Sequence, residues 1–263
     1  MTLQHGDNRR LWKPDARLKA ALSRAIDLIF PPHALNGAPK LQSRPQSSGY
    51  SADAWARVRF ISEPLCDGCG APFEYAMAER CTACLTSPRA FARARSAVIY
   101  DDASRDLILQ FKHADRTDLA GLFTGWINRA ADDLLGEADA IAPVPLHPSR
   151  LLVRRYNQAA EIARPLARRR GVAYLPDILQ RRKASESQAG KSASGRRRNV
   201  AGAFAVPDRA KPRIAGRRIL LIDDVLTTGA TAEACAKALL KAGAAAVDLA
   251  TVARVRDAVE MTI

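Results

Sequence analysis

The 263-residue sequence is short of aromatic residues and of long apolar runs, and each shortage disfavours a class of protein. No stretch approaches the ~18 consecutive apolar residues of a membrane-spanning helix, so we expect no transmembrane segment. Charged residues interrupt residues 15–30 throughout, which argues against a secretory signal and favours a cytoplasmic protein. Phe, Trp and Tyr make up 6% of the chain, which disfavours binding of nucleic acid by stacking on its bases.

Positive charge, in contrast, is abundant, with a formal net charge of +14. It is concentrated in residues 150–170 and 181–198, where arginines and lysines far outnumber the single acidic residue of each stretch. Clustered guanidinium groups favour polyanions such as phosphates, diphosphates or nucleic acid. A solvated basic surface without a ligand is the alternative, and the composition alone leaves both open.

The sequence pattern changes twice along the chain, which predicts three regions. Residues 1–60 contain an expected helix at 15–30 and a linker rich in Pro, Ser and Gly, residues 61–90 contain paired cysteines, and residues 91–263 form a larger domain. In that domain we expect strands at 95–101, 139–146, 217–222 and 245–254, and helices at 104–114, 119–135, 157–171 and 232–243. Strands that alternate with helices predict an α/β fold, a parallel sheet flanked by helices on both faces.

Four of the five cysteines form two CxxC pairs, Cys66 with Cys69 and Cys81 with Cys84, separated by eleven residues. Each CxxC turn directs two thiolates at one metal, and two turns complete the tetrahedral sulfur site of structural zinc. Disulfides are the weaker explanation in a reducing compartment. Because protein ligands fill all four positions, the expected role of the Zn²⁺ is structural. Cys235 stands alone on an expected helix and is read as a small buried residue.

The stretch Ile219–Thr231 combines an apolar run, the adjacent acids Asp223 and Asp224, and the residues TTGAT. Ligands of parallel sheets bind beyond the carboxyl ends of the strands, which is where the two acids are expected. The loop Thr227, Thr228, Gly229, Ala230 and Thr231 offers hydroxyl groups and backbone amides that lead into a helix, an arrangement that binds phosphate. A phosphate there would bring a sugar over the two carboxylates, whose oxygens suit vicinal hydroxyls. The alternative is a helix-capping turn with incidental aspartates.

This stretch resembles the phosphoribosyl-diphosphate motif of type I phosphoribosyltransferases. The resemblance implies that Asp223 and Asp224 hold the ribose 2′- and 3′-hydroxyls and that residues 227–231 hold the 5′-phosphate.

The resemblance extends over most of residues 15–254 to the ComF family, competence-associated proteins with a zinc ribbon fused to a phosphoribosyltransferase domain. The segments that carry it are CDGCG, YDDASRDLILQFKHADRTDLAGLF, APVPLHPSRLLVRRYNQAAEIARPLA and RRKASESQAGKSASGRRRNVAGAF. The implied fold is a type I phosphoribosyltransferase-like parallel sheet with a small N-terminal zinc-ribbon module. The sequence departs from many relatives at Ala34, Gly37, Ser51 and Ala54, where those carry additional cysteine pairs, so a second metal site would be lost here.

Two further loops are candidates for the diphosphate of the donor. By analogy with the family, the turn after the strand at 139–146 lies near the diphosphate, with candidate contacts His147, Arg150, Arg154 and Arg155, and Asn157 and Gln158 at the next helix. A basic loop that merely ends a strand is the alternative. The polar stretch 181–199 is expected to close over the donor and exclude water. Its candidate contacts are Lys183, Lys191, Arg196, Arg197 and Arg198, and a simple linker is the alternative.

As an enzyme, the protein would bind phosphoribosyl diphosphate with Mg²⁺, which neutralises the diphosphate, and transfer the phosphoribosyl group to an acceptor. No residue stands out as a general base, and the sequence does not identify the acceptor. His113 is either a residue of the cleft or an exposed helix end.

The main alternative is a non-catalytic module that binds single-stranded DNA and retains the phosphoribosyl pocket. The basic clusters support it, as does the family's association with DNA uptake, and a competence helicase would then be the natural partner. A housekeeping purine-salvage enzyme is the third interpretation, disfavoured because the zinc module has no role in that chemistry.

Overall fold

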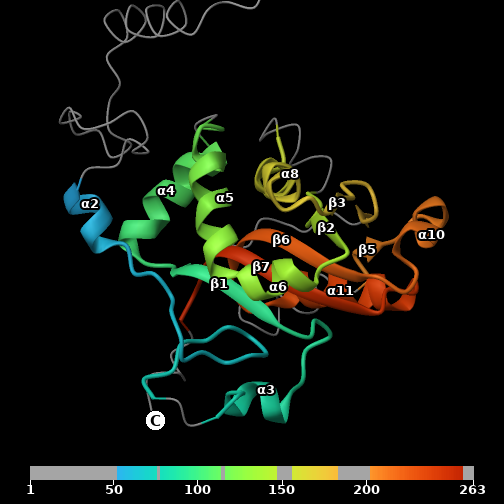
Figure 1. Ribbon diagram of the computed structural model, residues 1–263, viewed down its shortest axis with the longest axis horizontal. Helices are drawn as coiled ribbons and strands as arrows, with labels where there is room; N and C mark the ends of the chain where they lie inside the picture. Colours follow the sequence, from blue (N-terminus) through green and yellow to red (C-terminus); the bar gives the residue numbers. More distant parts are fainter. Residues whose placement is uncertain (1–51, 76–77, 114–115, 147–155, 183–201, 257–263) are drawn as a thin grey trace, which may run out of the picture. The chain divides into compact units, whose positions relative to one another are not determined.

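A five-stranded parallel sheet forms the centre of the fold (Figure 1). The computed structural model describes residues 52–75, 78–113, 116–146, 156–182 and 202–256. Across the sheet, the strands follow in the order β1 (Ala94–Ile99), β7 (Ala246–Arg254), β6 (Arg218–Leu226), β2 (Ala140–Pro143) and β3 (Ala173–Tyr174). All four pairings are parallel. Residues 54–263 form one compact unit, which contains this sheet.

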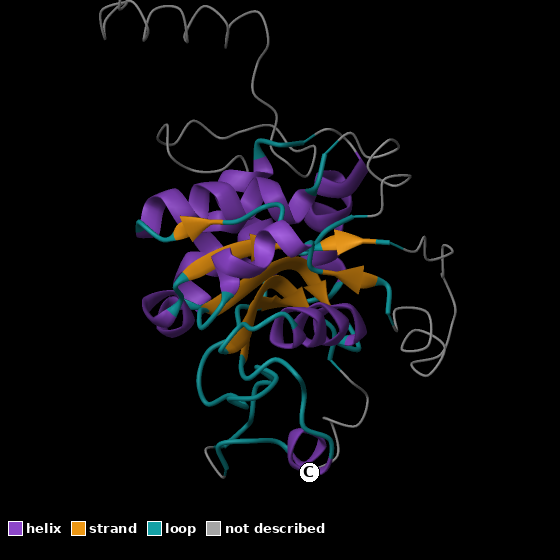
Figure 2. Ribbon diagram, turned by 90° about the vertical axis from the view of Figure 1, so that its right-hand side faces the viewer, coloured by secondary structure: helices purple, strands orange, loops and turns teal. Residues whose placement is uncertain are grey.

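Helices lie on both sides of the sheet (Figure 2). They are α4 (Asp102–His113), α5 (Leu119–Ala130), α6 (Asp132–Glu137), α8 (Gln158–Arg170) and α11 (Ala230–Lys241). Helices α5 and α8 pack against β1, β2 and β6, and α11 packs against β7. Shorter elements are α2 (Ala52–Arg57), α3 (Thr82–Thr86), α10 (Lys211–Ile214), the 3-10 helix η1 (Asp208–Ala210) and the antiparallel pair β4 (Gln180–Arg181) and β5 (Phe204–Ala205).

The central strand β6 is apolar on both faces because helices cover both of its sides. Ile219 and Leu221 pack in one hydrophobic cluster with Cys235 and Leu239 of α11. Side chains alternate across a strand, so Leu220, which is also fully buried, lies on the other face. A strand buried on both faces consists of consecutive apolar residues. The apolar run in the sequence therefore predicts the central position of β6.

The parallel sheet flanked by helices confirms the fold class expected from the sequence. Most boundaries differ from the expected ones by at most three residues, and two differences are larger. The helix expected at 119–135 is interrupted at Ala131, which leaves the helical region, and α6 then begins with Asp132 and Asp133. Aspartate is a poor residue within a helix and a favourable one in its first turn, which explains the break. The strand expected to end at residue 222 continues to Leu226. The helix expected at 15–30 lies outside the described residues.

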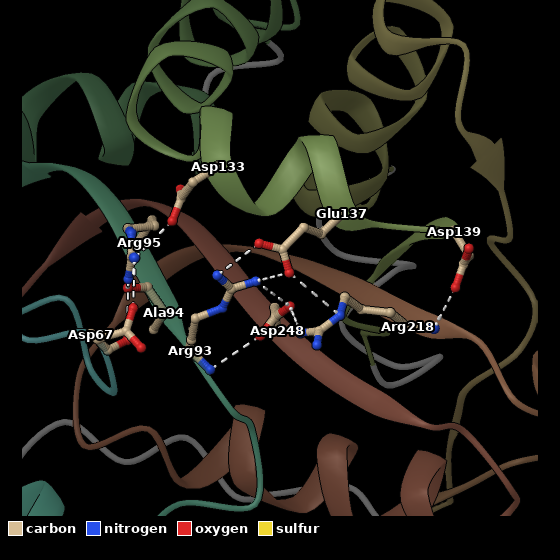
Figure 3. Close-up of polar contacts among 9 residues, drawn as sticks. All are labelled: Asp67, Arg93, Ala94, Arg95, Asp133, Glu137, Asp139, Arg218 and Asp248. Carbon is tan, nitrogen blue, oxygen red and sulfur yellow. Dashed lines mark hydrogen bonds and ion pairs between the residues drawn. The ribbon is translucent and has the colours of Figure 1, made fainter.

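A network of ion pairs lies at the amino ends of the central strands (Figure 3). The buried carboxylate of Asp248 accepts hydrogen bonds from the backbone N–H of Arg93 at 3.1 Å and from Nη1 of Arg218 at 2.8 Å. Glu137 of α6 pairs with Arg93 at 2.6 Å. This end of the sheet is therefore occupied by structural contacts, and the opposite end carries the candidate site.

Within the part of the chain described, no helix has the length and hydrophobicity needed to cross a membrane.

Candidate functional site

The four cysteines predicted to bind metal come together in one cluster. Their Sγ atoms all lie within 4.8 Å of one another, and those of Cys69 and Cys81 are 3.7 Å apart. In a tetrahedral site with metal–sulfur distances of ~2.3 Å, sulfurs are about 3.8 Å apart, so the cluster is close to the size such a site needs. Among the described residues, this is the one group of metal-binding side chains of that kind. The cluster could hold a metal ion.

The electrostatics of the cluster favour a bound cation. Hydrogen bonds from the Cys69 thiol and from the backbone N–H of Cys81 lower the pKa of Cys66 to about 4, although burial opposes this. The hydrogen bond to Cys66 and burial raise the pKa of Cys69, and burial with the charge of Cys66 raises that of Cys84 to about 12. One thiolate thus suppresses ionisation of its neighbours. A divalent cation at the centre would remove this repulsion, because metals bind thiolates.

The cysteine module, residues 61–90, is held against the edge strand β1 by charge and by close backbone packing. The guanidinium of Arg95 bonds Asp67 of the module at 2.8 Å and Asp133 of α6 at 2.7 Å (Figure 3). Gly70 has a φ of +69°, and a Cβ atom there would lie 2.6 Å from the carbonyl oxygen of Ala94. At the end of β7, Arg254 donates to the carbonyl of Cys69 at 3.2 Å. The module therefore packs on the same sheet that carries the acidic pair.

The acidic pair lies within β6 rather than beyond it, because the strand stays paired with β7 as far as Leu226. Adjacent side chains of a strand point to opposite faces, so Asp223 and Asp224 have different surroundings. The carboxylate of Asp224 lies 3.0 Å from Nζ of Lys112 in α4, and both side chains are 17% exposed. Asp223 accepts a hydrogen bond from the backbone N–H of Asp224 at 2.9 Å.

The surroundings of Asp223 favour its protonated form. Burial and the neighbouring charge of Asp224 raise the pKa of Asp223 to about 7, although the charges of Lys112 and Arg181 oppose this. Cys235 is fully buried, as expected for a small core residue, and burial together with the charge of Asp223 raises its pKa. A group that titrates near neutral pH at the end of a central strand is typical of a ligand-binding site.

The loop that follows β6 leads directly into α11, and residues 227–231 include the first two residues of that helix. Gly229 adopts the left-handed conformation with a φ of +75° and immediately precedes the helix, which begins at Ala230. Among the described residues, the backbone amides of Thr231 and Ala232 have no hydrogen-bond acceptor. These amides lie at the positive end of the α11 dipole, where an anion is stabilised.

The start of α8 fixes the end of β2 to the end of α4. The side chain of Asn157 accepts a hydrogen bond from the amide of Ala159 and donates to the carbonyl of Val144, both at 3.1 Å. Gln158 is buried and donates to the carbonyl of Lys112 at 3.5 Å. The hydroxyl of Tyr156 donates to the carbonyl of Phe111. These contacts give Asn157 and Gln158 structural roles in addition to any contact with a ligand.

Several predicted site residues lie outside the described residues, and their contacts with a ligand stay predictions. They are His147, Arg150, Arg154, Arg155, Lys183, Lys191, Arg196, Arg197 and Arg198. His113 ends α4, and its side chain is also outside the description. Lys112, the partner of Asp224, is not among the residues predicted from the sequence. The sequence gives only weak evidence for a role of Lys112. It follows the buried Ile108 by four residues, so it lies near the apolar face of α4 that packs against the rest of the domain.

Comparisons with known proteins give one family model and several similar proteins. The family model described as "Phosphoribosyl transferase domain" matches residues 157–262, which include β6, the loop Thr227–Thr231, α11 and β7. A solved glutamine phosphoribosylpyrophosphate amidotransferase from B. subtilis has a TM-score of 0.35 and 18% identity, over 55% of this chain and 30% of that chain.

Two relatives match over most of their length. "Competence protein F" of Haemophilus influenzae is 33% identical over 187 residues, which are 69% of this chain and 81% of that protein. "DNA utilization protein YhgH" of Escherichia coli K12 is 30% identical over 199 residues, 74% of this chain and 86% of that protein. With this identity and coverage, the chain belongs to the competence protein F family and carries a type I phosphoribosyltransferase domain.

Proposed function

We propose that the protein binds phosphoribosyl diphosphate at the carboxyl end of β6 and transfers its phosphoribosyl group to an acceptor, in a process of DNA uptake or DNA metabolism. The observation that carries the proposal is the order strand, acidic pair, Gly229 and helix α11, with two amides at the helix start that have no acceptor among the described residues. The family's association with competence and the relatives named for DNA utilization support the process.

In the proposed site each group has a separate task. The amides of residues 227–231 and the dipole of α11 bind the 5′-phosphate. Asp223 and Asp224 bind the ribose hydroxyls, with Lys112 holding Asp224 in place. Mg²⁺, bound by the phosphate oxygens of the donor, would neutralise the diphosphate. Catalysis would then depend on positioning and electrostatic stabilisation.

We propose a structural zinc ion at Cys66, Cys69, Cys81 and Cys84, in a module at residues 61–90 between an N-terminal region at 1–60 and a phosphoribosyltransferase domain at 91–263. The spacing of the sulfurs and the amide donated to Cys66 support this proposal. All five cysteines are free of disulfides. That state favours the reducing cytoplasm expected from the sequence.

Calorimetry with phosphoribosyl diphosphate and Mg²⁺ tests the donor site. We expect the wild type to bind and the double variant D223N/D224N to bind at least tenfold more weakly while it keeps its fold, because the ribose loses two carboxylate acceptors. Gly229→Val should also weaken binding, since its side chain would meet the guanidinium of Arg89 at 3.3 Å in a left-handed conformation. Unaltered affinity in both variants would contradict the site assignment.

Binding of single-stranded DNA is the second candidate function, favoured by the net charge of +14 and by the relatives named for DNA utilization. If Arg181, Arg182 and residues 196–198 contact the backbone at three to five phosphates, the logarithm of affinity should fall with that of salt with a slope of roughly −2 to −3.5. Replacing residues 196–198 by Ala should flatten that slope for all sequences alike. A variant that instead loses only donor binding would favour the enzyme. A helicase partner belongs to this second candidate alone.

A further inference from the structure

Three successive residues where the cysteine module ends, residues 89–91, contact the loop after β6 and the first turn of α11. Nη1 of Arg89 donates to the carbonyl oxygen of Thr228 at 3.0 Å. The backbone N–H of Ala90 donates to the carboxylate of Glu233 in α11 at 2.8 Å. The buried ring of Phe91 lies 3.7 Å from the position that a Cβ atom of Gly229 would occupy. The segment thus supports both the loop and the first turn of α11.

The same segment follows the cysteine cluster directly in the chain. Cys84 lies in α3, and the backbone N–H of Ser87 donates to the carbonyl of Ala83 in the same short helix. Arg89 follows two residues later and is half-buried. The position of Arg89 therefore depends on the fold of the cysteine module, and that fold would depend on the bound metal.

The hydrogen bond from Arg89 to the carbonyl of Thr228 also orients the N–H of Gly229, because the two groups belong to one planar peptide. In a trans peptide the C=O and N–H bonds point in opposite directions. Because the guanidinium holds the carbonyl of Thr228, the N–H of Gly229 in the same peptide is directed away from Arg89. Gly229 belongs to the loop Thr227–Thr231, whose amides we propose to bind phosphate. Without the guanidinium, this peptide could rotate and present its carbonyl oxygen to the anion.

We propose that Arg89 is a positioning residue of the phosphate loop, and that it couples metal binding in the cysteine module to phosphate binding at α11. The proposal rests on the proposed function and gives the cysteine module a role in it. Coupling between two sites is reciprocal, so phosphoribosyl diphosphate should strengthen the retention of metal as much as metal strengthens the binding of phosphoribosyl diphosphate. The role differs from structural support because it predicts an effect of one ligand on the other.

The first experiment compares R89A, R89K and the control R105A, whose arginine is exposed on α4. Calorimetry with phosphoribosyl diphosphate and Mg²⁺ should show about a tenfold loss of affinity for R89A, partial recovery for R89K and wild-type affinity for R105A. Metal content should stay at about one ion per chain in all three. Wild-type affinity in R89A, or an equal loss in R105A, would overturn the proposal.

The second experiment measures the coupling in the full-length wild type and in the variants R105A and R89A. Release of Zn²⁺ to a chelator is followed with and without phosphoribosyl diphosphate. We expect release to be suppressed about 5- to 10-fold by the donor in the wild type and in R105A, and much less in R89A. A donor that binds tightly without affecting zinc release overturns the coupling and leaves the proposed function intact. A wild type that does not bind the donor overturns both.

Discussion

The cysteine module and the carboxyl end of the sheet assemble their functional groups in different ways. The module takes its four sulfurs from one short stretch between Cys66 and Cys84. The carboxyl end of the sheet combines Lys112 of α4 with the acidic pair of β6 and the loop before α11, which follow much later in the sequence. The first arrangement would depend on an ion for its stability, whereas the second is held by the packed core. Variants should therefore damage the two regions by different mechanisms.

Loss of one sulfur should have the largest effect. Cys81→Ser should abolish metal binding and lower the free energy of unfolding by about 4 kcal/mol or more, because metal loss removes the centre that organises the module. Metal analysis and thermal unfolding measure the result. Cys235→Ala is the matched control: this cysteine lies in the core outside the cluster, so metal content should not change. A metal-free Cys81→Ser variant as stable as the wild type would refute the dependence on an ion.

The interface between the two regions should be the next most sensitive position. Gly70→Ala should cost about 3 kcal/mol, because the left-handed backbone disfavours a side chain and the new Cβ would lie 2.6 Å from the carbonyl oxygen of Ala94. Gly171→Ala is the control, since it has a φ of +66° with no atom within 4 Å and should cost only about 1 kcal/mol. Chemical unfolding compares the two. Equal costs would mean that the module does not pack closely on β1.

The acidic pair should make stability depend on pH. The pKa of Asp223 is raised from 3.8 to about 7, so the folded protein retains a proton that the unfolded chain has lost. This contribution is complete below pH 4 and is lost as pH rises through 7. Between pH 5 and pH 8, the loss of this contribution should lower the free energy of unfolding by roughly 2–3 kcal/mol. Asp223→Asn should flatten this part of the profile. An unchanged slope in the variant would assign the titration to another group.

The ion pair between α4 and β6 should give the smallest of these effects. Lys112→Met should cost about 1–2 kcal/mol, because it leaves the mostly buried carboxylate of Asp224 without its cation. It should also raise the pKa of Asp223 further, since the charge of Lys112 lowers that pKa in the wild type. A pH profile of unfolding measures both. The exposed pair of Arg213 and Asp177 is the control, and R213M should cost less than about 1 kcal/mol.

Local patterns in the sequence predicted four strands of the central sheet, β1, β2, β6 and β7, and the order of the motifs, but not the two-residue strand β3. The apolar run of Ile219–Ile222 predicted the central strand, and two CxxC turns predicted the cluster, since each depends on residues close together in the chain. The continuation of β6 to Leu226 was not predictable in this way. It depends on pairing with β7, a partner that enters only when the sheet forms.

The sequence by itself determined the parallel sheet, the four-sulfur cluster and the order of acidic pair, glycine loop and helix. Each of these features depends on the periodicity or spacing of residues that are close together in the chain, so it can be predicted from a single sequence. The tertiary structure alone decided that Lys112 meets Asp224, that Gly70 must accommodate the carbonyl of Ala94 and that Arg89 reaches Thr228. Each of these contacts joins segments that are distant in the chain, and their meeting depends on how helices and strands pack around one core.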